Sequence, residues 1–327
     1  MKFLHLSDLH ITADDAANEP LRQRFAFCGQ HYRDHFFIVT GDIIDNEGAV
    51  APGTPLPHDH ENPLSVMALV KTAFAHPPPP LGPIQPHLDR VIVSLRKTTE
   101  LFALLPPGRV FLVPGNHDYG LCGNLYAEEY IRAFDDHLFN RINRNTDGSF
   151  FVTSTVLNPD FTVRPRSARY PISYVITQSG QPLVSLLGLN TIAEPGPDAT
   201  VLATGSIGGN QMTCIERFSA GEGFIPGLHQ TLGICTICFF HHHPWIHSDV
   251  TMKLRDADQL MGQLRNKVDL VLFGHRHVER RYEPAQVAAG GIRFGAIAAG
   301  SSRAEHHAWE IDIASSIDWR FRTVPIV

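Results

Sequence analysis

Short apolar runs alternate along the chain with segments in which apolar residues recur every three to four positions. The runs have the length of buried strands, and they lie at Lys2–Leu6, Phe36–Thr40, Arg109–Val113, Leu183–Leu189, Ile234–Phe240 and Val268–Phe273. The periodic segments predict helices at Leu21–Tyr32, Leu88–Leu105, Leu125–Ile142, Gln211–Phe218 and Asp256–Val268. Strands that alternate with helices in this way are typical of a layered α/β fold.

Three segments depart from this alternation. From Ile292 to the end, residues 292–327, short period-two runs such as "HAWEIDI" predict closing antiparallel strands. Residues 46–87 carry ten prolines and cannot form a central strand, so we expect a surface insertion, either a packed ornament or a lid or specificity loop. Residues 143–182 are rich in turn formers and predict an extra hairpin. We expect residues 1–327 to form a single domain with these additions.

Composition narrows the class of partner. A net charge of -6 gives no broad basic surface, so long nucleic acid is not the expected partner. The first ten residues, "MKFLHLSDLH", place His and Asp where a signal peptide needs an unbroken apolar run, and no later segment approaches the roughly 18 apolar residues of a membrane span. We therefore expect a cytoplasmic protein with no membrane span and leave its oligomeric state open.

The cysteines indicate no special chemistry, whereas the histidines hint at metal binding. The five cysteines are odd in number and irregularly spaced, which is not a disulfide framework. Cys235 and Cys238 form a C-x-x-C, which has a redox interpretation, but they lie inside an apolar run and we favour buried structural thiols. The 19 histidines are more than an ordinary share and hint at metal binding, which only their positions can decide.

Five of the predicted strands are followed directly by residue types that bind metals. In chain order the five blocks are Ser7-Asp8-Leu9-His10, Gly41-Asp42-Ile43-Ile44-Asp45, Pro114-Gly115-Asn116-His117-Asp118, His241-His242-His243-Pro244 and Gly274-His275-Arg276-His277. Side chains at i and i+2 of an extended segment point the same way, so His275 and His277 can converge on one side. Carboxylates mixed with imidazoles suit Mn, Fe or Zn rather than Ca, and the lack of cysteine ligands argues against a structural zinc site.

In these blocks the chain resembles the calcineurin-like metallophosphoesterases, whose pattern is D-x-H, G-D-x-x-D, G-N-H-D/E, H-x-P and G-H-x-H in this order. The resemblance spans residues 4–277. It implies a four-layer α/β/β/α sandwich of two mixed β-sheets flanked by helices. It also implies an enzyme, a metal-dependent phosphoric ester hydrolase.

The resemblance implies two divalent or mixed-valence metal ions, with Mn, Fe and Zn as candidates. The first ion would be held by Asp8, His10, Asp42 and His277, and the second by Asp42, Asn116, His242 and His275, with Asp42 as the bridge. Two such ions attract an anionic phosphate and lower the pKa of bound water toward about 7, which supplies hydroxide for the attack.

The remaining motif residues have less direct roles. The resemblance places His117 outside the metal ligands, facing the scissile bond as an acid or electrostatic stabiliser, with Asp118 fixing its tautomer and orientation. Asp45 is expected to support a ligand or a loop. In the triple histidine, His241 and His243 share one face of an extended segment and His242 takes the other, so only one of these faces can point at the metals. The H-x-P spacing selects His242, with His243 as the next candidate.

The blocks, together with "GSIGGNQMTCIERF", look most like the branch that contains class III cyclic-nucleotide phosphodiesterases. The 46–87 insertion and the 124 positions from Asp118 to His242 depart from that branch. The leading prediction is a hydrolase of phosphodiesters, cyclic nucleotides or other small diesters, acting on a small phosphoester substrate. A phosphomonoesterase on the same metal centre, a nuclease and a non-catalytic scaffold are the alternatives.

Overall fold

Two β-sheets, formed by strands from along the whole chain, organise the fold. The computed structural model describes residues 1–45, 85–118, 127–142, 144–146, 148–156, 170–192, 204–220, 234–245, 254–286, 292–315 and 317–327. The first sheet has five strands in the order β12-β11-β1-β2-β3. Their bounds are β1 Lys2–Leu6, β2 His35–Thr40, β3 Val110–Val113, β11 His307–Ile313 and β12 Trp319–Pro325.

The second sheet has seven strands in the order β4-β5-β6-β7-β8-β10-β9. Their bounds are β4 Phe151–Val156, β5 Ile172–Gln178, β6 Gln181–Gly188, β7 Cys235–Phe239, β8 Leu270–Phe273, β9 Arg280–Tyr282 and β10 Ala296–Ala298. Both sheets are mixed. The strands β1, β2 and β3 run parallel in the first sheet, as do β6, β7, β8 and β10 in the second, and the other pairs are antiparallel.

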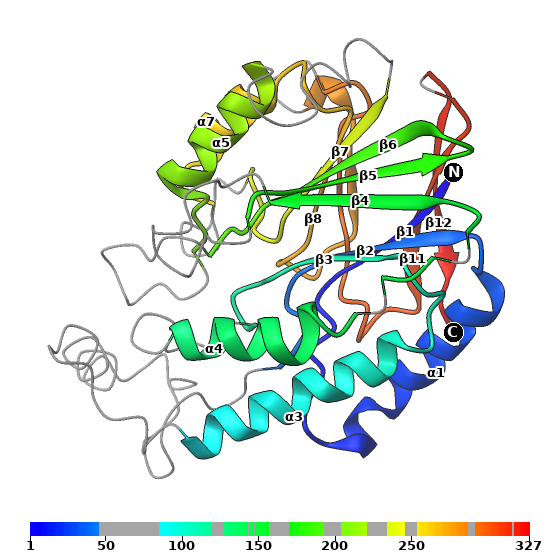
Figure 1. The fold of residues 1–327 in the computed structure, drawn as a ribbon, viewed down its shortest axis with the longest axis vertical. Helices are drawn as coiled ribbons and strands as arrows, with labels where there is room; N and C mark the ends of the chain where they lie inside the picture. The colour runs from blue at the N-terminus through cyan, green and yellow to red at the C-terminus, as the bar shows by residue number, and fades with distance from the viewer. Residues whose placement is uncertain are drawn as a thin grey trace, which may run out of the picture.

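Helices cover the outer faces of the stacked sheets, as Figure 1 shows. One side carries α1 (Asp15–His31), α3 (Gln85–Phe102) and α4 (Ala127–Phe134), and the other carries α5 (Gly208–Ala220) and α7 (Ala257–Leu264). The two mixed sheets flanked by helices confirm the predicted α/β/β/α sandwich. None of the described helices combines the length and the apolar character needed to cross a membrane.

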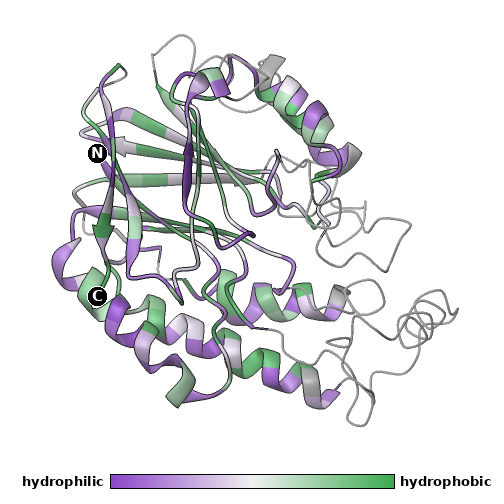
Figure 2. Ribbon diagram, turned by 180° about the vertical axis from the view of Figure 1, so that it is seen from behind, coloured by the Kyte–Doolittle hydropathy of each residue, from purple (hydrophilic) through white to green (hydrophobic). Residues whose placement is uncertain are grey.

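The central strands bury both faces, one in each of two core clusters, which is why they appear in the sequence as largely apolar runs. Along β7, Ile237 belongs to the cluster between the sheets, whereas Cys238 belongs to the cluster under α5 and α7. Leu272 and Val271 of β8 divide in the same way. Figure 2 shows hydrophobic residues along the strands and alternating bands of hydrophobic and hydrophilic residues along the helices.

The predicted elements exist, with shifted boundaries. Helix α1 begins at Asp15 rather than Leu21 because Asp14 caps it, accepting a hydrogen bond from the backbone N–H of Ala16 at 2.9 Å, and Pro20 is tolerated near the helix start. The helix predicted to end at Ile142 is α4 followed by a π-helical turn at Asp135–Phe139. The "HAWEIDI" run is β11, which pairs antiparallel with both β1 and β12.

The less regular segments are described only in part. Residues 46–84 of the proline-rich insertion lie outside the described residues. Within 143–182, β4 and β5 form an antiparallel pair. Cys235 and Cys238 are buried free thiols in different core clusters, and burial raises the pKa of Cys235 to about 11.

Candidate metal centre

The carboxyl ends of β1, β2, β3, β7 and β8 meet at one edge of the two sheets, and the five sequence blocks lie there. The loops are tied to one another by hydrogen bonds. The backbone N–H of His10 donates to the carbonyl of Asp42 at 3.0 Å, and the N–H of Gly274 donates to the carbonyl of His241 at 3.0 Å. Across the sheets, the N–H of His275 donates to Oδ2 of Asp8 at 3.2 Å.

Two glycines allow these loops to approach closely. Gly41 has a φ of 82°, and a Cβ there would lie 2.6 Å from Nδ1 of His241. A Cβ on Gly115 would lie 2.2 Å from Oδ1 of Asp42, a distance that real side chains do not reach. Glycine at both positions therefore leaves space for the Asp42 carboxylate and the His241 ring.

A first cluster joins three predicted ligands. Nε2 of His277 lies 3.2 Å from Oδ1 of Asp8 and 3.2 Å from Nε2 of His10. One ligand atom from each of these three residues lies within 4.8 Å of the others. Asp8 is buried, whereas the side chain of His277 is 49% exposed, so the cluster is open to solvent on the His277 side.

A second cluster surrounds His241. Its Nε2 lies 3.2 Å from Oδ2 of Asp42, 3.1 Å from Oδ1 of Asn116 and 3.1 Å from Nδ1 of His275. Nδ1 of His241 contacts the carbonyl of Thr40 at 2.7 Å, which fixes the ring and leaves Nε2 facing the other three side chains. All four cluster residues are buried.

His241 takes the place in this cluster where we expected His242. The strand explains the difference. Ile237 and Phe239 of β7 face the space between the sheets, and His241 continues that parity beyond the strand end. The spacing to Pro244 selects His242 and alternation from the buried face of β7 selects His241, and the His242 ring also lies near the cluster, with its centroid 4.4 Å from that of His275.

The other two histidines of the triplet have different surroundings. Nδ1 of His242 lies 2.7 Å from Oγ1 of Thr191, and its buried Nε2 has no hydrogen-bond partner among the described residues. His243, the second candidate from the sequence, lies away from both clusters: its Nε2 contacts the hydroxyl of Tyr282 at 2.8 Å.

The protonation states suit cation binding. Burial alone would raise the pKa of the two aspartates, but His277 holds the pKa of Asp8 below its usual value, and His241 with His117 holds that of Asp42 well below. Burial lowers the pKa of His10 to about 4, so its ring is neutral near pH 7. Asp42 raises the pKa of His241 to about 9 against the effect of burial, so a cation bound there would displace a proton.

His117 lies beside both clusters. Its ring centroid is 4.8 Å from that of His10, and its Nε2 is 4.0 Å from Oδ2 of Asp42. Its Nδ1 is 3.8 Å from Oδ1 of Asp45. Asp45, rather than Asp118, is therefore the carboxylate that faces Nδ1 of His117, and with His10 these two residues form a third group whose ligand atoms lie within 4.8 Å of one another.

Asp118, which we expected to orient His117, is occupied elsewhere. Its Oδ1 accepts hydrogen bonds from the backbone N–H groups of Ile43 at 2.9 Å and Ile44 at 3.0 Å, and its Oδ2 accepts one from Gly115 at 2.7 Å. Burial and the nearby Asp42 charge raise the pKa of Asp118 to about 7. The structure gives Asp118 the task of joining two loops.

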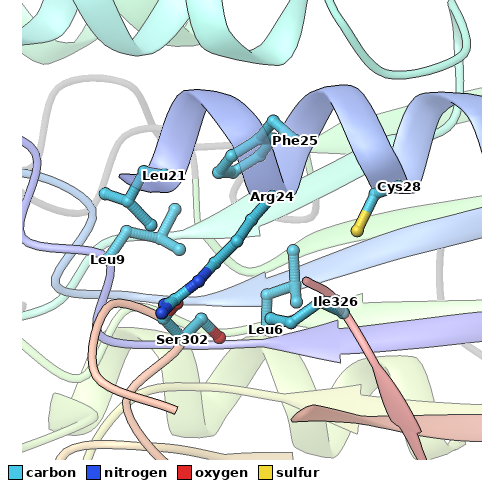
Figure 3. Close-up of a pocket in the computed structure, with 8 residues that line it drawn as sticks. All are labelled: Leu6, Leu9, Leu21, Arg24, Phe25, Cys28, Ser302 and Ile326. Carbon is cyan, nitrogen blue, oxygen red and sulfur yellow. The ribbon is translucent and has the colours of Figure 1, made fainter. Parts of the chain in front are cut away.

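The loop after β10 holds Ser7 and Asp8 in place by hydrogen bonds. Ser301 donates from Oγ to the carbonyl of Asp8 at 3.0 Å, and the N–H of Ser302 donates to the carbonyl of Ser7 at 2.9 Å. Figure 3 shows Arg24 of α1 reaching across a small pocket to this loop, where its guanidinium donates to the carbonyl of Ser302 at 2.6 Å. The helix thereby fixes the position of Asp8 indirectly.

The donor atoms fit divalent cations. Two ligands on one tetrahedral ion at about 2.0–2.2 Å lie about 3.3–3.6 Å apart, slightly more than the 3.1–3.2 Å separations in both clusters. Nε2 of His10 and Nε2 of His277 face each other at 3.2 Å. Without an ion between them, only one of the two nitrogens can carry a hydrogen there. The oxygen and nitrogen donors suit Mn, Fe or Zn.

Comparison with known proteins agrees with this geometry. No curated protein matches the sequence. Solved structures that match include the one described as GAP50, the anchor in the inner membrane complex of Plasmodium, at 12% identity over 100% of this chain and 84% of that chain with a TM-score of 0.47, a likeness that carries no functional argument. A family model described as calcineurin-like phosphoesterase matches residues 1–279, and the chain therefore belongs to the calcineurin-like phosphoesterase family.

Proposed function

We propose that the protein is a metal-dependent hydrolase of phosphodiesters. One observation carries the proposal: two clusters of carboxylate, amide and imidazole donors lie at one sheet edge, with His117 beside both. The first ion would be held by Asp8, His10, Asp42 and His277, and the second by Asp42, Asn116, His241 and His275. Asp42 would serve both ions, because a carboxylate offers two oxygen atoms.

Two bound cations supply Lewis acidity and positive charge, which activate water and attract the phosphoryl oxygens. The protein's own contribution is to hold the donors rigidly. The backbone N–H of His117 donates to Oδ1 of Asp42 at 3.0 Å, so the bridge and the histidine keep a fixed relation.

His117 is the group placed to handle the leaving oxygen. Its Nε2 faces the clusters, and its Nδ1 faces Asp45 at 3.8 Å. The Asp45 carboxylate lies on the Nδ1 side of the ring, and a proton held at Nε2 would pass to the departing ester oxygen. Because the side chain of His117 is 28% exposed, a substrate can reach it.

The preference for diesters rests on the resemblance of α5 and the histidine-proline block to the branch that contains class III phosphodiesterases. The test uses metal-loaded protein with bis(4-nitrophenyl) phosphate and 4-nitrophenyl phosphate. We expect kcat/KM to be at least about tenfold higher for the diester, a barrier difference of about 1.4 kcal/mol. A tenfold preference for the monoester would instead make the protein a phosphatase, and no turnover of either ester with metal bound would indicate a scaffold.

A further inference from the structure

Two arginines beside the metal centre have no carboxylate partner. Arg276 lies between His275 and His277, is exposed, and makes no hydrogen bond or ion pair within the described part of the chain. Arg280 is also exposed, with its guanidinium 4.6 Å from the centre of the Tyr282 ring. Their neighbour Arg281 is different, because it pairs with Glu283 at 3.1 Å. In a chain of net charge -6, two uncompensated cations at one place need an explanation.

Two aromatic rings lie next to these cations. Trp245 and Tyr282 are half-buried, and their ring centroids are 5.5 Å apart. His243 holds both: its Nδ1 accepts from the backbone N–H of Trp245 at 3.0 Å, so the proton is on Nε2, which donates to the Tyr282 hydroxyl at 2.8 Å. Trp245, Tyr282, Arg276 and Arg280 are named here the aromatic shelf.

The shelf adjoins the metal centre without being part of it. His243 is two residues beyond His241, and Arg276 is flanked by a histidine of each cluster. Burial and the charges of Arg276 and Arg280 together lower the pKa of His243 to about 4, and the Arg280 guanidinium lies over the Tyr282 ring that His243 contacts. A group bound on the shelf would therefore be a part of the substrate away from the reacting phosphorus.

The chemistry of the shelf selects the kind of group. Tryptophan and tyrosine stack on flat rings, and exposed guanidinium groups pair with phosphate or carboxylate oxygens. Resting on the proposed function, we infer that the substrate is a diester in which one ester group carries both a flat ring and a second anionic group. The ring lies on Trp245 and Tyr282, and the second anion pairs with Arg276.

Three diesters with the same 4-nitrophenyl leaving group test this inference. Methyl 4-nitrophenyl phosphate has no ring on its other ester group, thymidine 5′-(4-nitrophenyl phosphate) has a ring, and the 3′-phosphorylated form of the latter adds a second anion. We expect kcat/KM to rise at each step, and the added phosphate to contribute about fivefold, as a partly solvated charge pair does.

Arg276→Met removes the cation while keeping an unbranched apolar side chain in place of the arginine stem. The advantage of the 3′-phosphorylated substrate over thymidine 5′-(4-nitrophenyl phosphate) should fall to less than about twofold in this variant. Arg320→Met is the matched control, because Arg320 is a 72% exposed side chain on β12 of the other sheet, and it should keep the full advantage. An unchanged advantage in Arg276→Met would overturn the inference.

A binding measurement separates this inference from the proposed function. Trp245 is one of three tryptophans, so thymidine 3′,5′-bisphosphate should quench fluorescence in the wild-type protein and much less in Trp245→Phe. Arg276→Met should weaken that binding about fivefold. Binding of the bisphosphate without diester turnover would contradict the proposed function and support the aromatic shelf. Diester turnover without quenching by the bisphosphate would support the proposed function and contradict the shelf.

Discussion

Backbone strain is concentrated at the metal centre. Seven non-glycine residues of the described chain have a positive φ, a conformation that side chains disfavour. Five of them are Asp8, His10, Asp42, His275 and His277, with φ between 47° and 77°. Such strain persists only where the surrounding structure imposes it, and here the interloop hydrogen bonds do so. The cost is consistent with side chains held in place for a ligand.

The choice between the histidines of the triplet is testable at the level of single residues. His241→Ala removes the nitrogen that faces Asp42, Asn116 and His275, so we expect one of the two ions to be lost. His242→Ala should keep both, because its ring contacts Thr191 instead. Metal analysis of the two purified variants checks this. The assignment is wrong if the His242 variant loses an ion and the His241 variant does not.

His117 should affect the reaction but not the metals. His117→Ala is expected to retain both ions and to lose about 10²–10⁴ in kcat, the usual contribution of a positioned acid. Asp45→Asn should lower kcat less, because it leaves the ring present but without the charge 3.8 Å from Nδ1. Asp118→Asn serves as the contrast. Since its carboxylate accepts hydrogen bonds from three backbone N–H groups of the described chain, this change should reduce thermal stability more than Asp45→Asn does.

Among the structural elements, the strand ends could be predicted from the sequence and the side-chain orientations only in part. The runs before Asp8, Asp42 and Asn116 are mostly apolar because both faces of these strands are buried, so their ends are visible as the change to polar residues and glycine. Which histidine of the triplet faces the clusters depends on the parity of β7 relative to the opposite sheet. That relation joins residues about 200 positions apart and leaves no local pattern.

Asp118 illustrates the same limit. Its place directly after His117 suggested a contact between the two side chains, but its carboxylate turns to the amides of Ile43 and Ile44, which come from the loop after β2. The sequence cannot indicate that these amides are the partners of Asp118, because a backbone N–H is present at nearly every position. Only the parallel pairing of β2 with β3 brings the two loops together.

The close approach of the loops predicts that alanine has opposite effects on stability at two glycines. A Cβ on Gly274 would lie 1.8 Å from Oγ of Ser7 and 2.8 Å from Oδ2 of Asp8, so Gly274→Ala should destabilise the protein by about 2–3 kcal/mol and weaken metal binding. Gly262 lies inside α7 with no atom within 4 Å of a built Cβ. Gly262→Ala should therefore stabilise by about 0.5–1 kcal/mol. Denaturant titrations of both variants measure the two effects, and equal changes would contradict the packing.

At the scale of the whole molecule, the metal centre spans the two sheets. The first sheet contributes Asp8, His10, Asp42 and Asn116 from the loops after β1, β2 and β3, and the second contributes His241, His275 and His277 from the loops after β7 and β8. Cations bound by both sets would connect the sheets at an edge where the described loops otherwise meet through a few hydrogen bonds. Metal binding should therefore stabilise the fold as well as the site.

Removing the metals should lower the melting temperature of the protein. An ion present at about 100 times its Kd stabilises the native state by about 2.7 kcal/mol, which corresponds to a melting shift of about 4 °C for a chain of this size. Calorimetry with and without a chelator measures the shift. Asp42→Asn is the control, because loss of the bridging charge weakens both sites and should reduce the chelator's effect to less than half. A full shift in Asp42→Asn would mean that the stabilising ion binds elsewhere, and that Asp42 does not join the two sites.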